Sequence, residues 1–230
     1  MTRSELAARL DHSLLKPDAD LAAVRAGAAL VREWGVRFYC VQPWAIGAAV
    51  DALRGSVARV VAVLSFPHGC DETPVKVEAA RAAVAAGAAE LDMVLNVGLL
   101  KSGEADRVRD DITVVIRAAG VPVKVILETC LLNREEKVLA CRLAREEKVL
   151  ACRLARDAGA PFVKTSTGFG SGGATVEEVR LLRQTVGPVL GVKAAGGVRT
   201  LAHSLSMLEA GASRLGTSAG TAILRALPAA

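Results

Sequence analysis

Aromatic side chains are scarce in this sequence of 230 residues: they make up 3% of it, and only one of them is a tyrosine. Proteins that bind single-stranded nucleic acid stack the bases on aromatic rings and gather their basic residues in one groove. Here the basic residues, which give a formal net charge of +5, are spread along the chain. We therefore expect no nucleic-acid partner, and a solvated basic surface that can attract a small phosphorylated substrate.

Histidine and cysteine are also few and scattered. His12, His68 and His203 lie far apart in the chain, and no two cysteines have the Cys-x-x-Cys spacing of a zinc site. An odd number of cysteines without clustering predicts no disulfide framework and fits reduced thiols in the cytoplasm. The five cysteines are Cys40, Cys70, Cys130, Cys141 and Cys152. We predict no metal site.

Long apolar runs are absent as well. No stretch reaches the length of about 18 apolar residues that a membrane-spanning helix needs. Residues 1–6 lack the apolar segment of a secretory signal peptide. We expect a cytoplasmic protein with no membrane partner.

Short apolar runs alternate regularly with helical patterns along the chain, and this alternation predicts a parallel sheet. Eight runs in a chain close to about 250 residues are typical of the eight-stranded barrel, and 52% hydrophobic residues can fill one core. We predict the α/β class and a single TIM barrel domain over residues 1–230. Strands are expected near 9–12, 36–41, 57–64, 90–95 and 121–127, in the runs that end at Lys164 and Lys193, and at 213–216. Helices are expected at 2–8, 21–34, 43–53, 73–86, 104–119, in a long stretch after 127, at 175–186, at 200–209 and from 218.

Two of the predicted strands end in a lysine that glycines follow. Lys164 lies in the segment PFVKTSTGFG, and Lys193 lies in the segment GVKAAGG. A lysine at the end of a buried strand loses hydration, which favours its neutral, nucleophilic amine, although it could instead extend its ammonium group to solvent. Active sites of such barrels lie at the carboxyl ends of the strands. We therefore expect the two lysines to meet there, with repulsion between their ammonium groups favouring loss of a proton from one of them.

Other charged residues fall inside predicted strands. Asp92 has apolar neighbours and could either relay protons while a carbinolamine forms and breaks down or act as a structural counter-ion for a lysine. In the segment VKVILE, a period of two places Lys124, Ile126 and Glu128 on one face. We predict that Glu128 is the ion-pair partner of Lys124, and that Lys124 takes no part in the chemistry.

Glycine-rich loops follow the seventh and eighth predicted strands. They contain Gly196-Gly197 and residues 216–220, and each precedes a predicted helix. Barrels of this kind frequently bind phosphate in these two loops, at the amino end of a helix. Either loop alone could be an ordinary turn, but their shared position predicts a phosphate site.

A tandem repeat interrupts the chain: residues 134–144 (REEKVLACRLA) recur without a gap and without a change as residues 145–155. Eleven residues make about three helical turns, so both copies present nearly the same apolar face. Such identity indicates a recent duplication or an engineered chain, not a solenoid unit. We expect either one lengthened helix or one docked copy with the other as an extension or loop. The lysine-bearing strands lie outside the repeat, so the site should survive with some loss of stability.

Six segments give the sequence a recognisable pattern. They are LDHSLLKP at 10–17, ELDMV at 90–94, KVILET at 124–129, GAPFVKTSTGFGSGG at 159–173, VKAAGGVR at 192–199 and SRLGTS at 213–218. This pattern covers nearly the whole chain and resembles the deoxyribose-phosphate aldolases, a family of class I (Schiff-base) aldolases with a barrel fold. The sequence departs from the family in the tandem repeat, in Ser65, where glycine is usual, and in Gln42, where asparagine is frequent.

The resemblance implies roles for individual residues. Lys164 would form the Schiff base, Lys193 would perturb the acid–base behaviour of Lys164, and Asp92 would shuttle protons. A supporting polar network would contain Asp11, Lys124 and Cys40. The residues expected around the substrate and its phosphate are Thr167, Gly168, Gly196, Gly197, Gly216 and Ser218.

The implied reaction is the reversible cleavage of 2-deoxy-D-ribose 5-phosphate to glyceraldehyde 3-phosphate and acetaldehyde. It needs no cofactor, because the protonated imine itself accepts the electron pair. The remaining alternatives are a Schiff-base lyase that acts on another phosphorylated sugar and a barrel that binds a sugar phosphate without turning it over. A homodimer or a larger homo-oligomer is expected, since barrels of this size often pair through exposed helices.

Overall fold

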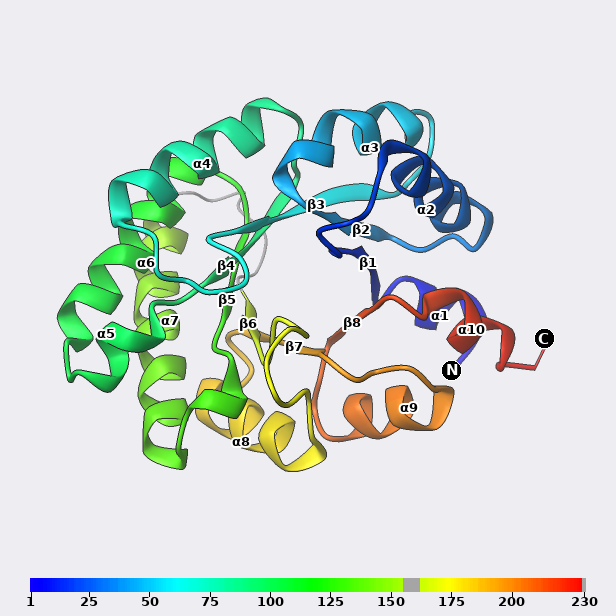
Figure 1. Cartoon of the computed structure of the whole chain (residues 1–230). Helices are drawn as coiled ribbons and strands as arrows, with labels where there is room; N and C mark the ends of the chain where they lie inside the picture. The colour runs from blue at the N-terminus through cyan, green and yellow to red at the C-terminus, as the bar shows by residue number, and fades with distance from the viewer. Residues whose placement is uncertain (155–161, 229–230) are drawn as a thin grey trace.

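The computed structural model describes residues 1–154 and 162–228. Its eight strands are all parallel and close into a barrel, in which each strand pairs with the next in chain order and the eighth pairs with the first (Figure 1). The strands are β1 (Leu10–Leu14), β2 (Phe38–Val41), β3 (Arg59–Leu64), β4 (Glu90–Val94), β5 (Val123–Ile126), β6 (Phe162–Lys164), β7 (Gly191–Ala195) and β8 (Arg214–Thr217). The predicted TIM barrel is confirmed.

Helices surround the barrel and alternate with the strands (Figure 1). They are α1 (Arg3–Ala7), α2 (Leu21–Glu33), α3 (Ile46–Ala52), α4 (Thr73–Ala85), α5 (Val97–Lys101), α6 (Ala105–Ala119), α7 (Arg134–Leu154), α8 (Val176–Val186), α9 (Leu201–Glu209) and α10 (Gly220–Arg225), with short 3₁₀ helices η1 (Pro43–Ala45) and η2 (Thr129–Leu131). Within the described ranges, no helix has the length and apolar character needed to cross a membrane.

The predicted and observed helices differ in three places. The helix expected over 43–53 is divided into η1 and α3, and the helical stretch expected after 127 is divided into η2 and α7. Helix α5 is not predicted, because its five residues are too few to show a helical period in the sequence. The start of α5 is capped by Asn96, whose side chain accepts a hydrogen bond from the N–H of Leu99 (3.0 Å); in the sequence, Asn96 reads as the polar end of a strand.

Apolar side chains fill the space between the strands and the helices, and Tyr39, Met93 and Val192 are among the fully buried residues there. The interior of the barrel holds a small apolar cluster of Leu15, Phe38, Cys40, Val61 and Val63. Charged side chains occupy much of the remaining interior; Asp11, Asp92, Lys124 and Lys193 have no exposed surface. The bulky branched side chains that usually fill such barrels are therefore partly replaced by ionic groups.

The tandem repeat lies in α7, which has 21 residues, whereas the other described α-helices have 5 to 15. The first copy packs between α6 and α8 and buries Ala140, Cys141, Leu143 and Ala144. The second copy continues the same helix to Leu154, and its last residue lies outside the described ranges. The first copy therefore occupies the docking position on the barrel.

Candidate active site

Side chains that point into the barrel form layers, because alternate residues of each strand face inward and the register aligns alternate strands. The layer nearest the amino ends of the strands consists of Phe38, Glu90, Phe162 and Arg214. The second consists of Asp11, Val61, Lys124 and Lys193, and the third of Cys40, Asp92, Lys164 and Gly216. Six of these twelve residues are Asp, Glu or Lys, and Arg214 is a seventh residue with an ionisable side chain.

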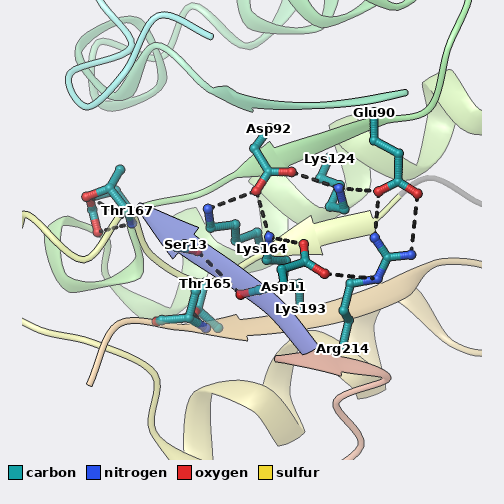
Figure 2. Close-up of polar contacts among 12 residues, drawn as sticks. Asp11, Ser13, Glu90, Asp92, Lys124, Lys164, Thr165, Thr167, Lys193 and Arg214 are labelled. Carbon is teal, nitrogen blue, oxygen red and sulfur yellow. Dashed lines mark hydrogen bonds and ion pairs between the residues drawn. The ribbon is translucent and has the colours of Figure 1, made fainter. Parts of the chain in front are cut away.

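Asp92 holds three lysines together in the middle of the barrel (Figure 2). Its Oδ1 accepts a hydrogen bond from the Nζ of Lys124 (2.8 Å). Its Oδ2 accepts hydrogen bonds from the Nζ of Lys164 (2.9 Å) and of Lys193 (2.8 Å). The structure thus brings together the three residues expected to do the chemistry, and it shows that Lys124 belongs to the same cluster.

Two more carboxylates complete the cluster. Asp11 accepts a hydrogen bond from Lys193, and its other oxygen lies 3.6 Å from the Nε of Arg214. Glu90 pairs with the Nζ of Lys124 (2.5 Å) and with the Nη1 of Arg214 (2.5 Å). The connected groups are four cations and three carboxylates, so their net charge is +1 when all are ionised. Loss of one proton from a lysine would make the cluster neutral.

The predicted pairing of Lys124 with Glu128 is wrong. Strand β5 ends at Ile126, and Glu128 has a left-handed backbone (φ 52°), so the period of two does not extend to it. The carboxylate of Glu128 instead accepts hydrogen bonds from the N–H (3.3 Å) and the hydroxyl of Thr167. Glu128 therefore fixes the loop that follows β6.

The carboxylates also change the expected behaviour of Lys193. Burial lowers its pKa, but Asp11 and Asp92 outweigh burial and hold the pKa above its usual range. The repulsion between ammonium groups expected from the sequence does not decide the charge of Lys193, because Asp92 lies between it and Lys164. Burial raises the pKa of Asp92, but Lys124, Lys164 and Lys193 together hold it well below its usual range. In the resting site, Lys193 is therefore a cation and Asp92 an anion.

A cavity of about 270 Å³ opens above the cluster, at the carboxyl ends of the strands. Lys164 lines it, together with all the residues predicted for the phosphate site: Thr167, Gly168, Gly196, Gly197, Gly216 and Ser218. Gly196 has a φ of 84°, and a Cβ there would lie 3.0 Å from the Cα of Gly173, so only glycine fits where the two loops meet. The cavity therefore joins the amine of Lys164 to the glycine-rich loops that follow β6, β7 and β8.

Residues 10–227 match the DeoC/LacD family of aldolases. The chain belongs to this family. It is 49% identical to the deoxyribose-phosphate aldolase of Brevibacillus brevis, over 94% of this chain and 93% of that one. It is 47% identical to the deoxyribose-phosphate aldolase of Thermococcus kodakarensis, over 99% of both chains. The tetrameric deoxyribose phosphate aldolase of Aeropyrum pernix superposes with a TM-score of 0.86 at 28% identity, over 97% of this chain and 91% of that one. The family resemblance of the sequence is confirmed.

Two cationic residues that line the cavity of this aldolase are absent from the sequence-based site: Lys16 and Arg199. Both occur in segments that carry the family pattern, LDHSLLKP and VKAAGGVR. The sequence feature that could have indicated them is a basic residue a few positions after the end of a strand. The phosphate site predicted from the sequence contains only glycines, Thr167 and Ser218, so it leaves out these two charges.

Cys40 lies in the third layer of the aldolase barrel, beside Asp92 and Lys164, and is fully buried. Burial, with the nearby charge of Asp92, raises the pKa of its thiol to about 11. The thiol is therefore protonated at neutral pH. It fills the interior as a small apolar group, as the cluster of Leu15, Phe38 and Val63 around it indicates.

The two single-residue departures from the family, Ser65 and Gln42, lie next to residues that line the cavity. Ser65 has a left-handed backbone (φ 51°), which explains why glycine is usual there. Gln42 donates a hydrogen bond from its Nε2 to the carbonyl oxygen of Leu15 (3.0 Å) and so ties the loops after β1 and β2 together. Phe66, which follows Ser65, lies edge to face with Phe169 at 5.3 Å between ring centres, and its ring centre is 6.0 Å from the Nζ of Lys164.

Proposed function

We propose that this class I aldolase reversibly cleaves 2-deoxy-D-ribose 5-phosphate to glyceraldehyde 3-phosphate and acetaldehyde through a Schiff base on Lys164. The observation that carries the assignment is the position of Lys164. Three of the described lysines contact Asp92, and Lys164 is the one among them that also lines the cavity. The names of the relatives from Brevibacillus brevis and Thermococcus kodakarensis support the substrate.

The charge balance of the cluster supports Lys164 as the neutral amine. Lys124 and Lys193 each contact two carboxylates, whereas Lys164 contacts Asp92 alone among the described residues. The cluster carries one positive charge in excess, and the cation with the fewest carboxylate partners loses least when its proton leaves.

The reaction follows from a free amine in this position. The Nζ of Lys164 adds to the aldehyde carbon of the open-chain sugar phosphate, and loss of water leaves a protonated imine. Loss of the proton on the C3 hydroxyl breaks the C2–C3 bond, and the bonding electrons form an enamine as glyceraldehyde 3-phosphate leaves. One proton added to the enamine carbon and one water added to the imine release acetaldehyde and the amine.

Asp92 and Lys193 serve the proton transfers of this sequence. The Oδ2 of Asp92 lies between the Nζ atoms of Lys164 (2.9 Å) and Lys193 (2.8 Å), so a proton can pass between the two amines through one carboxylate oxygen. The same carboxylate stabilises the positive charge of the imine. Asp11 keeps Lys193 in place, and Lys124 does the same for Asp92.

The phosphate of the substrate binds to the loops after β6, β7 and β8. Gly168, Gly196 and Gly197 line the cavity and all have positive φ, a backbone conformation that can form an anion-binding concavity of N–H groups. Lys16 and Arg199 supply positive charge at the same cavity, and Ser218 supplies a hydroxyl. Phosphate bound at this end of the cavity directs the aldehyde toward Lys164.

We further propose that the protein forms a homo-oligomer, as the tetrameric relative from Aeropyrum pernix does. Sedimentation or light scattering of the purified chain measures this directly. A monomeric protein at micromolar concentration would contradict it.

Borohydride trapping tests the Schiff base. The protein is incubated with acetaldehyde or with deoxyribose 5-phosphate and reduced, and the added mass is located by peptide mass spectrometry. We expect one adduct on Lys164, its loss in Lys164→Ala, and its retention in the surface control Lys101→Ala. A folded protein that gives no adduct would refute the proposal and leave a barrel that binds sugar phosphates without chemistry.

Product analysis tests the substrate separately. Aldol addition to glyceraldehyde 3-phosphate is followed with acetaldehyde and with larger aldehyde or ketone donors. We expect acetaldehyde to be the preferred donor. An adduct on Lys164 together with a preference for another donor would assign the chain to a Schiff-base lyase with a different sugar phosphate.

A further inference from the structure

We propose that Arg214 and Glu90, at the amino end of the barrel, are positioning residues for the reaction at Lys164, because they close a ring of alternating charges that fixes the carboxylate of Asp92. The inference rests on the proposed function and assigns two residues that the sequence analysis did not single out. Neither lines the described cavity above the cluster, so they would act through other side chains.

The ring consists of two chains of ion pairs that start at one guanidinium group (Figure 2). In the first, Arg214 contacts Glu90 (2.5 Å), Glu90 contacts Lys124 (2.5 Å), and Lys124 reaches the Oδ1 of Asp92 (2.8 Å). In the second, the Nε of Arg214 lies 3.6 Å from Asp11, which pairs with Lys193, and Lys193 reaches the Oδ2 of Asp92 (2.8 Å). The two chains therefore meet on the two oxygens of one carboxylate.

The ring is neutral by itself. It contains three cations and three carboxylates in strict alternation, and each of its members has an oppositely charged neighbour on both sides. Lys164 contacts the ring only through Asp92 and is the one cation outside it among the connected groups. Both oxygens of Asp92 are therefore paired within the ring before substrate binds. Lys164, which lies outside the ring, is the group that can change its charge.

Arg214 is held more firmly than an exposed arginine would be. Its guanidinium carbon lies 3.8 Å from the centre of the Phe38 ring and 4.6 Å from the centre of the Phe162 ring. Its Nη1 and Nη2 both donate to Glu90, at 2.5 and 3.4 Å. A planar cation that stacks on two rings and forms a forked pair has one available orientation, so it holds the carboxylate of Glu90 in a fixed position.

A ring of buried ion pairs at the amino end of the barrel is not expected if these residues serve stability alone. Buried ion pairs add little to folding compared with apolar side chains of the same volume, because both groups must be dehydrated. Other barrels of this fold fill these positions with branched apolar residues. The proposed reaction at Lys164 gives a reason for the charged ring, because Asp92 must be oriented toward both Lys164 and Lys193.

Glu90→Gln tests the inference, since it keeps the shape of the side chain and removes its charge. We expect kcat for cleavage of deoxyribose 5-phosphate to fall roughly 10- to 100-fold, in the range seen when a catalytic group is misplaced, with KM within about twofold of the parent value because the phosphate loops are untouched. The rate of borohydride-trapped adduct formation with acetaldehyde should fall by a similar factor. Unchanged kcat would overturn the proposal.

Three further variants separate positioning from folding. Arg214→Met/Glu90→Gln removes one cation and one anion and keeps the bulk, so the double variant should be more stable than Arg214→Met while kcat stays low, because Lys124 still lacks Glu90. Recovery of kcat in the double variant would reduce the pair to a structural role and overturn the proposal. If Glu90→Gln alone does not fold, the double variant decides the question. Arg214→Lys keeps the charge and should recover part of the kcat that Arg214→Met loses.

Asp111→Asn is the matched control. Asp111 pairs with Lys76 at 2.6 Å, and both side chains are buried between α4 and α6, outside the barrel. This variant should lose stability without a change in kcat. A wild-type protein that forms no adduct on Lys164 would refute the proposed function, which is a different outcome from an active wild type with an equally active Glu90→Gln.

Discussion

Gly216 lies directly beside Lys193 inside the barrel: a Cβ at position 216 would be 3.0 Å from the Cε of Lys193 and 3.0 Å from the Cβ of Ala195. The side chain of Lys193 passes this glycine on its way to Asp92 (2.8 Å). The absence of a side chain at 216 therefore has a cause besides the approach of phosphate. It leaves room for a lysine to cross from β7 to the centre of the barrel.

Gly216→Ala should displace Lys193 from Asp92. We expect a loss of about 1–3 kcal/mol of stability from overpacking and a fall in kcat of roughly tenfold or more, because a small misplacement of a catalytic group is costly. Steady-state kinetics and thermal unfolding measure the two effects. Gly47→Ala is the control, since no atom lies within 4 Å of the Cβ it would introduce. Wild-type kcat in a folded Gly216→Ala protein would contradict the account of Lys193.

The ionised state of Asp92 should contribute to stability. Three lysines hold its pKa in the folded protein well below the value of 3.8 expected for an unperturbed aspartate. A depressed folded pKa stabilises the protein above the unfolded pKa, and this stability is lost as the pH falls through the folded pKa. The difference in unfolding free energy between the parent and Asp92→Asn should therefore be constant above about pH 5 and shrink below about pH 4. Denaturant unfolding at several pH values measures it, and a constant difference down to pH 2 would contradict the assignment.

Much of this fold can be predicted from the sequence because local patterns determine it. The alternation of apolar runs and helical segments predicts all eight strands, and the apolar runs that precede Lys164 and Lys193 predict that the two lysines meet. Lys164 ends β6 as expected, whereas Lys193 lies in the middle of β7. The ring that contains Arg214 could not be predicted, because its ion pairs depend on the register of all eight strands, and Arg214 and Glu90 are 124 positions apart. A local signal exists: Glu90 precedes Asp92 by two residues, so both face the interior.

Glu128 illustrates the opposite case, in which a local pattern misleads. The alternation in VKVILE continues past the last paired residue of β5, but the left-handed backbone at Glu128 (φ 52°) ends it. A carboxylate that was expected on Lys124 instead binds the backbone and hydroxyl of Thr167. Backbone conformation at a non-glycine residue cannot be predicted from hydrophobic period, since a period assumes that the strand continues.

Ser65→Gly should stabilise the protein. A serine with φ 51° is strained by its Cβ, and glycine relieves a strain of about 1 kcal/mol while losing part of this gain to the greater flexibility of the unfolded chain. The hydrogen bond that the Oγ of Ser65 accepts from the N–H of Asp71 is long (3.4 Å), so its loss costs little. We expect a net gain of up to about 1 kcal/mol, measured by thermal or denaturant unfolding. Ser65→Ala keeps the Cβ and should give no gain; equal stability of the two variants would show that the backbone is not strained.

Removal of one copy of the repeat should leave the aldolase active. The copies are identical, so deletion of residues 134–144 or of residues 145–155 produces the same chain. The docked copy supplies the buried residues Ala140, Cys141, Leu143 and Ala144 and the ion pair of Lys137 with Glu178 (3.0 Å), and the shortened chain retains all of them. We expect kcat and KM to stay within about twofold of the parent values, as for changes away from the site. Activity and circular dichroism of the shortened protein test this. An unfolded or inactive product would mean that the second copy supports the barrel and that the docking position cannot be filled by one copy alone.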